Sequence, residues 1–154
     1  MKLLIAVISF AVTSSSVATS SDGEACATFI KKSGNYKVAQ QNPQCLRAAD
    51  AGDSAAQYSV GMGYGFAGRP DLEEKYYRLA AAQGLAPAYL ALGHSLLEAH
   101  EDEAIQWYER FVETRADGYG YGSKLLADIF ERRGDQQQSR YWLSVCKASS
   151  YQGC

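Results

Sequence analysis

The clearest pattern along this chain is the spacing of apolar residues that is typical of α-helices. Between Ala88 and Leu97, apolar side chains recur every three or four residues, which places them on one face of a helix. Gly84 and Gly134 stand where this pattern breaks, and glycine suits the left-handed residue that ends a helix. No stretch shows the sustained apolar-polar alternation of a strand. We therefore expect an all-α protein with almost no sheet.

Acidic residues stand where the expected helices begin. Asp71 follows the break at Gly68-Arg69-Pro70, and Asp135 follows Gly134, so each is expected to cap the helix after it. The run Glu101-Asp102-Glu103 also lies at a helix start, where negative charge stabilises the positive end of the helix dipole. We interpret these carboxylates as structural and not catalytic.

The helical pattern repeats along the chain. Ala48-Ala49-Asp50-Ala51-Gly52 recurs as Ala80-Ala81-Ala82-Gln83-Gly84, and each copy is followed by an Ala and Tyr pattern and then by an apolar-Gly pair. These pairs are Val60-Gly61 and Leu92-Gly93, and Leu126-Ala127 continues the series. A spacing of about 34 residues is typical of repeats that contain two helices each. The sequence therefore predicts a stack of antiparallel helix pairs.

Gly61 and Gly93 fall inside expected helices, where glycine costs about 1 kcal/mol relative to alanine. The cost is explained if the two helices of a pair cross so closely there that no Cβ fits. Ala127, at the third position of the series, is the next smallest choice. We therefore predict a close helix crossing at each of these positions.

Residues from about Ala48 to Lys147 resemble tandem Sel1-like repeats, which are relatives of tetratricopeptide repeats. The resemblance rests on the Leu-Gly pair, the Gly-x-Pro-Asp turn, the Trp/Tyr-Tyr pair of the second helix and the Ala-Ala-x-x-Gly ending. The matched repeats are 54–84, 87–117 and, more loosely, 119–147. The resemblance implies a right-handed α-α superhelix of about three repeats across 48–148, preceded by N-terminal capping helices in 19–47.

The N-terminus has the features of an export signal. Lys2 is followed by an apolar run that ends at Val12, and Ser16-Val17-Ala18 places small residues before a cleavage point. The run is shorter than the roughly 20 apolar residues of a membrane-spanning helix. We expect residues 1–18 to be a signal peptide and the mature protein to be periplasmic or secreted, without a stable membrane anchor. The alternative is a buried N-terminal helix.

Four cysteines remain after this segment, at Cys26, Cys45, Cys146 and Cys154. An even number in an exported chain favours disulfides, and four cysteines allow three pairings. Proximity along the chain favours Cys26–Cys45 and Cys146–Cys154, the second closing a C-terminal tail at 149–154. A zinc site is the alternative, but none of these cysteines has a Cys or His neighbour at the two-to-four spacing of such sites.

The balance of charge excludes some partners, and the motifs identify no chemistry. The chain has 15 Lys and Arg against 17 Asp and Glu, a formal net charge of −2, which gives no reason to expect nucleic acid or an anionic membrane. The glycines from Gly63 to Gly68 spell a dinucleotide-binding motif, but no strand precedes them. His94 and Glu98 could share a metal ion, but no third ligand is visible, and Ser95 has no suitable base and acid. We expect no cofactor, no metal and no enzymatic activity.

The resemblance also implies where a partner binds. In tetratricopeptide-like repeats, the partner lies against a concave face that the first helix of each repeat lines. The expected partner-binding residues are Tyr58, Met62 and Phe66 in the first repeat, Leu90, His94, Leu97 and Glu98 in the second, and Lys124, Asp128, Glu131 and Arg132 in the third. Tyr58, Leu90 and Leu97 could instead pack between repeats. Trp107 and Trp142, in the second helices, are assigned to the core.

Two functions fit these observations. The first is an adaptor or scaffold that binds another protein in the export compartment, as most Sel1-like resemblance implies. The second is a periplasmic immunity protein that neutralises a secreted toxin such as a phospholipase effector, because some Sel1-like proteins of similar size act in this way. A hydrolase is a weaker third alternative, since the sequence contains no catalytic triad or metal-binding set.

Overall fold

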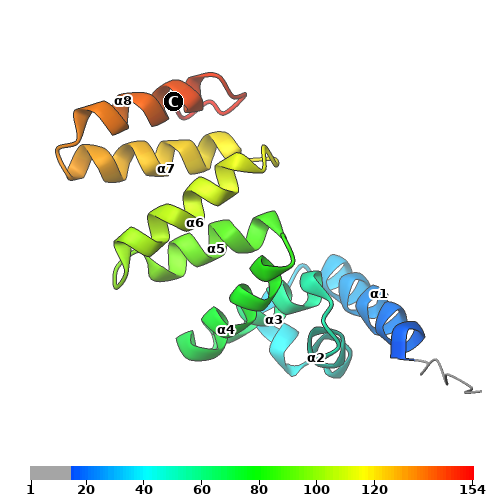
Figure 1. Cartoon of the computed structure of the whole chain (residues 1–154). Coiled ribbons are helices and arrows are strands. Elements are labelled where there is room, and N and C mark those ends of the chain that lie inside the picture. Colours follow the sequence, from blue (N-terminus) through cyan, green and yellow to red (C-terminus); the bar gives the residue numbers. More distant parts are fainter. Residues whose placement is uncertain (1–14) are drawn as a thin grey trace, which may run out of the picture.

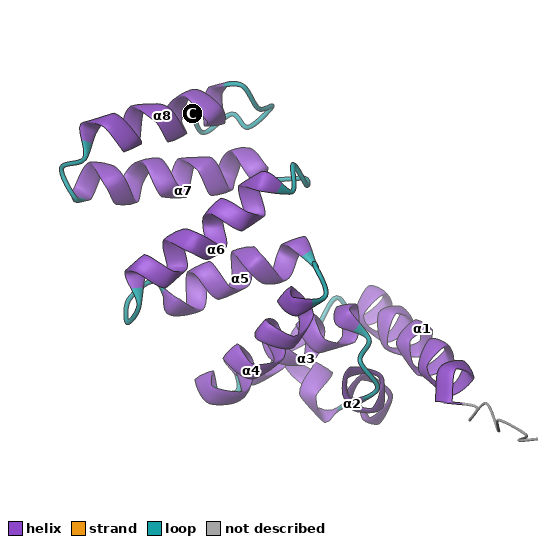
Figure 2. Ribbon diagram, viewed as in Figure 1, coloured by secondary structure: helices purple, strands orange, loops and turns teal. Residues whose placement is uncertain are grey.

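The computed structural model describes residues 15–154, and helices form most of that part of the chain (Figure 1). The helices are α1 (Ser15–Ser33), the 3-10 helix η1 (Tyr36–Gln41), α2 (Pro43–Asp50), α3 (Ser54–Phe66), α4 (Pro70–Ala82), α5 (Ala86–Leu96), α6 (Glu101–Glu113), α7 (Tyr119–Arg132) and α8 (Gln136–Lys147). Residues 15–154 contain no strand, which confirms the expected all-α class (Figure 2). Most of the predicted signal peptide lies outside the described residues, and its last residues, from Ser15 onward, belong to α1.

The helices pack in chain order. α3 packs mainly against α4, α5 against α6, and α7 against α8, and each of these antiparallel pairs contacts the next pair. The pairs follow one another along an elongated molecule, with α1 at one end and α8 at the other (Figure 1). α1, η1 and α2 occupy the region where capping helices were predicted, and they pack against α3.

The ends of the helices follow the sequence signals with one exception. The Asp135 side chain accepts hydrogen bonds from the backbone N–H groups of Gln137 and Gln138, at 3.1 and 3.0 Å, and so caps α8 as predicted. The prediction for Asp71 was wrong. Proline is favoured in the first turn of a helix, so α4 begins at Pro70, and Asp71 lies inside that turn, paired with Arg69 at 3.0 Å.

Gly61 and Gly93 lie where the two helices of a pair cross, as the sequence predicted. A Cβ atom on Gly61 of α3 would lie 2.7 Å from Cδ1 of Tyr77 in α4. A Cβ atom on Gly93 of α5 would overlap the ring of Tyr108 in α6. Real carbon atoms do not approach so closely, so each glycine makes room for an aromatic ring of the second helix. The pairs α3/α4 and α5/α6 therefore share the same glycine-tyrosine contact at their crossings.

The buried side chains form two clusters that meet at α4. One cluster gathers around Cys26, Cys45 and Val60, and the other contains the fully buried side chains of the later helices, Leu92, Tyr108 and Leu126. Tyr76 of α4 belongs to the first cluster, and its neighbour Tyr77 belongs to the second. Since adjacent residues of α4 contribute to both clusters, this helix joins the N-terminal region to the helix pairs that follow.

The four cysteines pair as chain proximity predicted. Cys26 of α1 bonds Cys45 of α2, with 4.7 Å between the Cα atoms, and Cys146 of α8 bonds Cys154, with 5.8 Å between the Cα atoms. Each bridge closes a short loop near one end of the described chain. In the chain-entropy model, a disulfide that closes a loop of about 15 residues stabilises the folded state by roughly 3 kcal/mol. Two disulfides are also consistent with an exported protein, because such bonds persist in oxidising compartments.

Candidate partner-binding face

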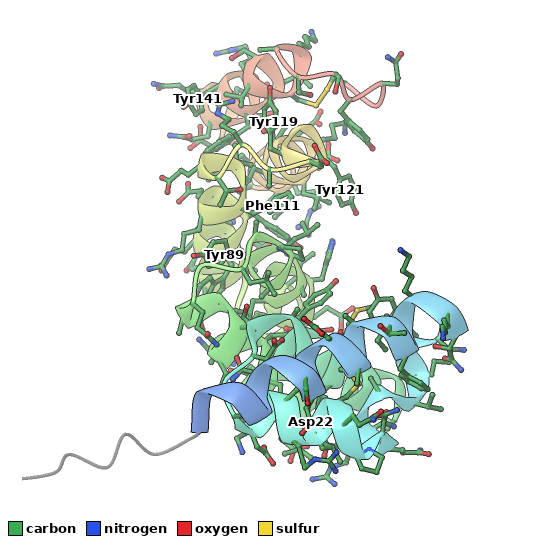
Figure 3. The ribbon with its side chains drawn as sticks, turned by 90° about the vertical axis from the view of Figure 1, so that its right-hand side faces the viewer. Asp22, Tyr89, Phe111, Tyr119, Tyr121 and Tyr141 are labelled. Atoms are coloured by element: carbon green, nitrogen blue, oxygen red, sulfur yellow. A yellow bond between two sulfur atoms is a disulfide. The ribbon has the colours of Figure 1, made fainter. Side chains whose placement is uncertain are left out.

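α3, α5 and α7 lie on one side of the molecule, and we call the surface that they form, with the hollows along it, the first-helix face. Figure 3 shows Tyr121 of α7 on the side towards which α1 and the C-terminal loop extend, and Tyr141 of α8 on the opposite side. Three hollows follow the first-helix face, and they lie beside α1 and α3, between α3 and α5, and between α5 and α7.

The hollow beside α1 is apolar. It has a volume of about 470 Å³, and side chains of α1, η1 and α3 line it, among them Ile30 and Tyr36. Lys31 is the one charged residue in its lining. Tyr58 and Pro87 line both this hollow and the next one, so the two hollows adjoin.

The central hollow, between α3 and α5, brings together four of the predicted partner-binding residues. It has a volume of about 400 Å³. Its lining includes the predicted residues Tyr58, Met62, Leu90 and His94. Glu73 and Tyr77 of α4 line the same hollow, although the sequence analysis did not assign them to the binding face.

Aromatic rings form one wall of the central hollow. The ring centroids of Tyr58 and Tyr77, which line this hollow, lie 5.8 Å apart at 31°. Tyr36, which lines the hollow beside α1, packs against Tyr58 with 6.5 Å between ring centroids at 74°. Burial raises the pKa of both the Tyr58 and the Tyr77 hydroxyl above the ordinary tyrosine value. Both hydroxyls therefore stay protonated at neutral pH and can donate hydrogen bonds.

His94 forms the other end of this hollow. Its Nδ1 atom lies 3.0 Å from the hydroxyl oxygen of Tyr108, and its ring packs edge-on against the Tyr108 ring with 5.5 Å between centroids. The His94 side chain is exposed on one side, but burial of the other side lowers the pKa of its imidazole. Burial also raises the pKa of Tyr108 to about 12. Near neutral pH, a protonated hydroxyl therefore faces a neutral imidazole, an arrangement that suits one hydrogen bond.

The third hollow, between α5 and α7, is charged. It has a volume of about 710 Å³. Its lining includes the predicted residues Leu97, Glu98, Asp128 and Arg132. Arg132 also pairs with Glu101 at 2.8 Å, and Asp128 pairs with the predicted residue Lys124 of the same helix. The face thus changes from apolar beside α1 to charged beside α7.

Three predicted residues, Phe66, Lys124 and Glu131, lie apart from these three hollows. Phe66, at the end of α3, is 59% exposed and lies under the Lys37 ammonium, which is 5.3 Å from the ring centroid. It lines a smaller hollow of about 270 Å³ at the rim of the face, together with Met62 and Glu73. Glu131 is exposed, and neither Glu131 nor Lys124 lines any of the hollows described above.

Tyr58, Leu90 and Leu97 have the packing contacts that the alternative interpretation of these residues predicted. Each of these side chains is half-buried and packs against the larger core cluster while it lines a hollow. Trp142 is buried, as predicted. Trp107 is only half-buried; it packs against the larger core cluster and stacks on Tyr89 with 5.8 Å between ring centroids.

Comparison with other proteins does not identify a family. The sequence matches no protein-family model, and a comparison with curated proteins finds no match either. Among residues 15–154, no group of three His, Cys, Asp or Glu side chains is placed to hold a metal ion. Within the same part of the chain, no helix combines the length and the apolar character that crossing a bilayer requires.

Proposed function

We propose that this protein is an exported adaptor that binds another protein along the first-helix face. In this proposal, the helix pairs are Sel1-like repeats stacked as a right-handed superhelix, and the hollows between successive first helices receive side chains of the partner. The two disulfides, one near each end of the described chain, support a role in an oxidising compartment.

The single observation that carries the proposal is the row of hollows along one side of the molecule. Half-buried apolar side chains, Tyr58, Leu90 and Leu97, line these hollows beside charged groups of α7 and of the turn that follows α5. Protein interfaces combine apolar anchors that fill pockets with a polar surround. The gradient from the apolar to the charged end also gives the face a direction, which allows it to distinguish the two ends of an elongated partner.

The shared packing of the first two pairs supports the assignment to repeats. Gly61 and Gly93 occupy corresponding places, each against a tyrosine ring of the following helix. Helix pairs built on a common crossing stack in a regular way and expose the same side of each first helix. A face formed by successive first helices is the expected result.

Affinity capture with two matched leucine variants tests the proposal. Leu90 lines the central hollow, whereas Leu79 of α4 is 41% exposed and lines none of the hollows described here. The full chain is exported with a C-terminal tag, and proteins that it retains are identified by mass spectrometry. We expect Leu90→Gln to lose the retained partner and Leu79→Gln to keep it. Equal retention by both variants would reject the first-helix face as the binding surface.

The effect of the chain on the activity of the retained protein then distinguishes an adaptor from an inhibitor. An enzyme that loses its activity when mixed one-to-one with the purified chain would show the immunity-type function, and a partner whose activity is unchanged would show an adaptor.

A further inference from the structure

Glu73 is the one carboxylate that lines the central hollow and the rim hollow of the first-helix face. Together with Met62 and Tyr77, it forms the wall that the two hollows share. The two hollows have volumes of about 400 and 270 Å³. A group that fills either of them therefore lies beside this carboxylate.

A glycine of the facing helix leaves the space that the Glu73 carboxylate occupies. A Cβ atom on Gly65 of α3 would lie 2.6 Å from Cδ of Glu73, so the carboxylate occupies the space that any other residue at position 65 would fill. Gly61, one turn earlier, makes room for Tyr77 in the same way. Gly61 and Gly65, four residues apart on α3, therefore leave space for Tyr77 and Glu73, four residues apart on α4.

Glu73 has no basic partner among residues 15–154, in contrast to its neighbours. Glu74 pairs with Arg78 at 2.7 Å, and Glu103 pairs with the same arginine at 2.7 Å. No Lys, Arg or His side chain of the described chain forms an ion pair with Glu73. Burial raises the pKa of Glu73, and the neighbouring Tyr77 hydroxyl offsets this only in part. The carboxylate is therefore poorly solvated and uncompensated, and a cation that enters the hollow would relieve both conditions.

Aromatic rings surround the same position. Tyr58 and Tyr77 line the central hollow, and Phe66 lines the rim hollow. Cations are attracted to the faces of such rings. The chain itself already places a cation in this region, since the Lys37 ammonium lies 5.3 Å from the centroid of Phe66.

We call the Glu73 carboxylate and the walls of the two hollows beside it the Glu73 seat. We propose that this seat receives a lysine or arginine side chain of the partner protein. The stem of that side chain packs on the tyrosine rings, and its charge pairs with the carboxylate. The inference rests on the proposed function, because it names the residue type that the partner presents to the centre of the first-helix face. Because the apolar hollow beside α1 adjoins the central hollow, we expect apolar residues to flank this basic residue in the partner.

The NMR signal of the Met62 methyl group reports directly on binding at the Glu73 seat. The chain contains two methionines, Met1 and Met62, so the ¹³C-methyl spectrum of the full chain has one signal from the wall of the seat, which Met62→Leu identifies. The probes are two peptides, acetyl-Leu-Lys-Leu-amide and the same peptide with the uncharged norleucine in place of lysine. We expect the lysine peptide to move the Met62 signal saturably at millimolar concentrations and to bind at least about fivefold more tightly than the norleucine peptide.

A matched pair of variants locates the charge. Glu73→Gln should abolish the preference for lysine, and Glu74→Gln, at the next position of the same helix, should keep it. Equal binding of the two peptides to the unaltered chain, no movement of the Met62 signal with either peptide, or an unchanged preference in Glu73→Gln would overturn the inference. Such a result would leave the proposed function standing if Leu90→Gln still loses the captured partner, so the two failures are distinguishable.

Discussion

The helix pairs α3/α4 and α5/α6 share one crossing and differ one turn away from it. In both pairs, a glycine of the first helix faces a tyrosine of the second, Gly61 with Tyr77 and Gly93 with Tyr108. Four residues after the glycine, α3 has Gly65, whereas Leu97 follows Gly93 at the same spacing. The residue four before the tyrosine is Glu73 in α4 and Ala104 in α6.

The two pairs differ in which helix supplies the larger side chain at this position. In α5/α6, the large side chain belongs to the first helix, because Leu97 is half-buried and Ala104 is fully buried. In α3/α4, the first helix has no side chain at this position, and the second helix supplies a carboxylate that fills the space. The same backbone arrangement therefore gives an apolar surface in one pair and an acidic seat in the other. The glycine-tyrosine contact is common to both crossings, and the residues one turn away from it determine the chemistry of the face.

The largest effect is expected where the two pairs agree. Gly93→Ala and Gly61→Ala should each lower the free energy of unfolding by about 1–2 kcal/mol, because the strain of overpacking against a tyrosine ring exceeds the gain of about 1 kcal/mol in helix propensity. Urea unfolding measures the change. In a Tyr108→Leu background, the penalty of Gly93→Ala should shrink, and a penalty that is unchanged there would show that the contact with the ring is not its cause.

A smaller effect on stability, with a large effect on binding, is expected where the pairs differ. Gly65→Ala should leave the free energy of unfolding within about 1 kcal/mol of its original value, because the flexible Glu73 side chain can rotate into solvent while alanine favours the helix. The same change should remove the preference of the Met62 site for the lysine peptide. A variant that destabilises as much as Gly61→Ala, or that keeps the preference, would contradict the seat at Gly65.

The smallest effect is the pH dependence that Glu73 contributes. Its pKa is raised in the folded protein, so the folded state holds this proton more firmly than the unfolded state. The contribution of Glu73 to stability therefore increases as pH falls through the raised pKa and levels off below the ordinary glutamate value of 4.5. Relative to Glu73→Gln, the unaltered chain should gain about 0.5 kcal/mol or less between pH 7 and pH 4, since the group keeps contact with solvent. Denaturant unfolding of both proteins across this range checks the sign, and a relative loss would contradict it.

The helical class, the close crossings and the disulfide pairs were predictable from the sequence because each depends on local signals. Glycine inside a helix lowers the stability of the helix, so glycines at corresponding positions indicate that a side chain would not fit there. Cysteines close in sequence pair readily. The start of α4 was not predicted correctly, because Pro70 and Asp71 both favour the first turn of a helix and the sequence does not show which residue precedes it.

The lining of the hollows was predictable only in part, for a similar reason. A register based on the first helices identified Tyr58 and Leu90, which face the hollows between those helices. It could not identify Glu73 and Tyr77, which reach the same face from the second helix past the glycines of α3. The matching four-residue spacings of Gly61 with Gly65 and of Glu73 with Tyr77 are the signal that could have revealed them.

The affinity of the purified partner for the two leucine variants tests the central claim most directly. Calorimetry should show that Leu90→Gln weakens binding by at least about tenfold, as expected when an apolar anchor in a pocket is replaced, whereas Leu79→Gln should bind within about twofold of the unaltered chain. A partner that binds all three proteins equally, or that loses affinity only with Leu79→Gln, would show that recognition does not occur along α3, α5 and α7.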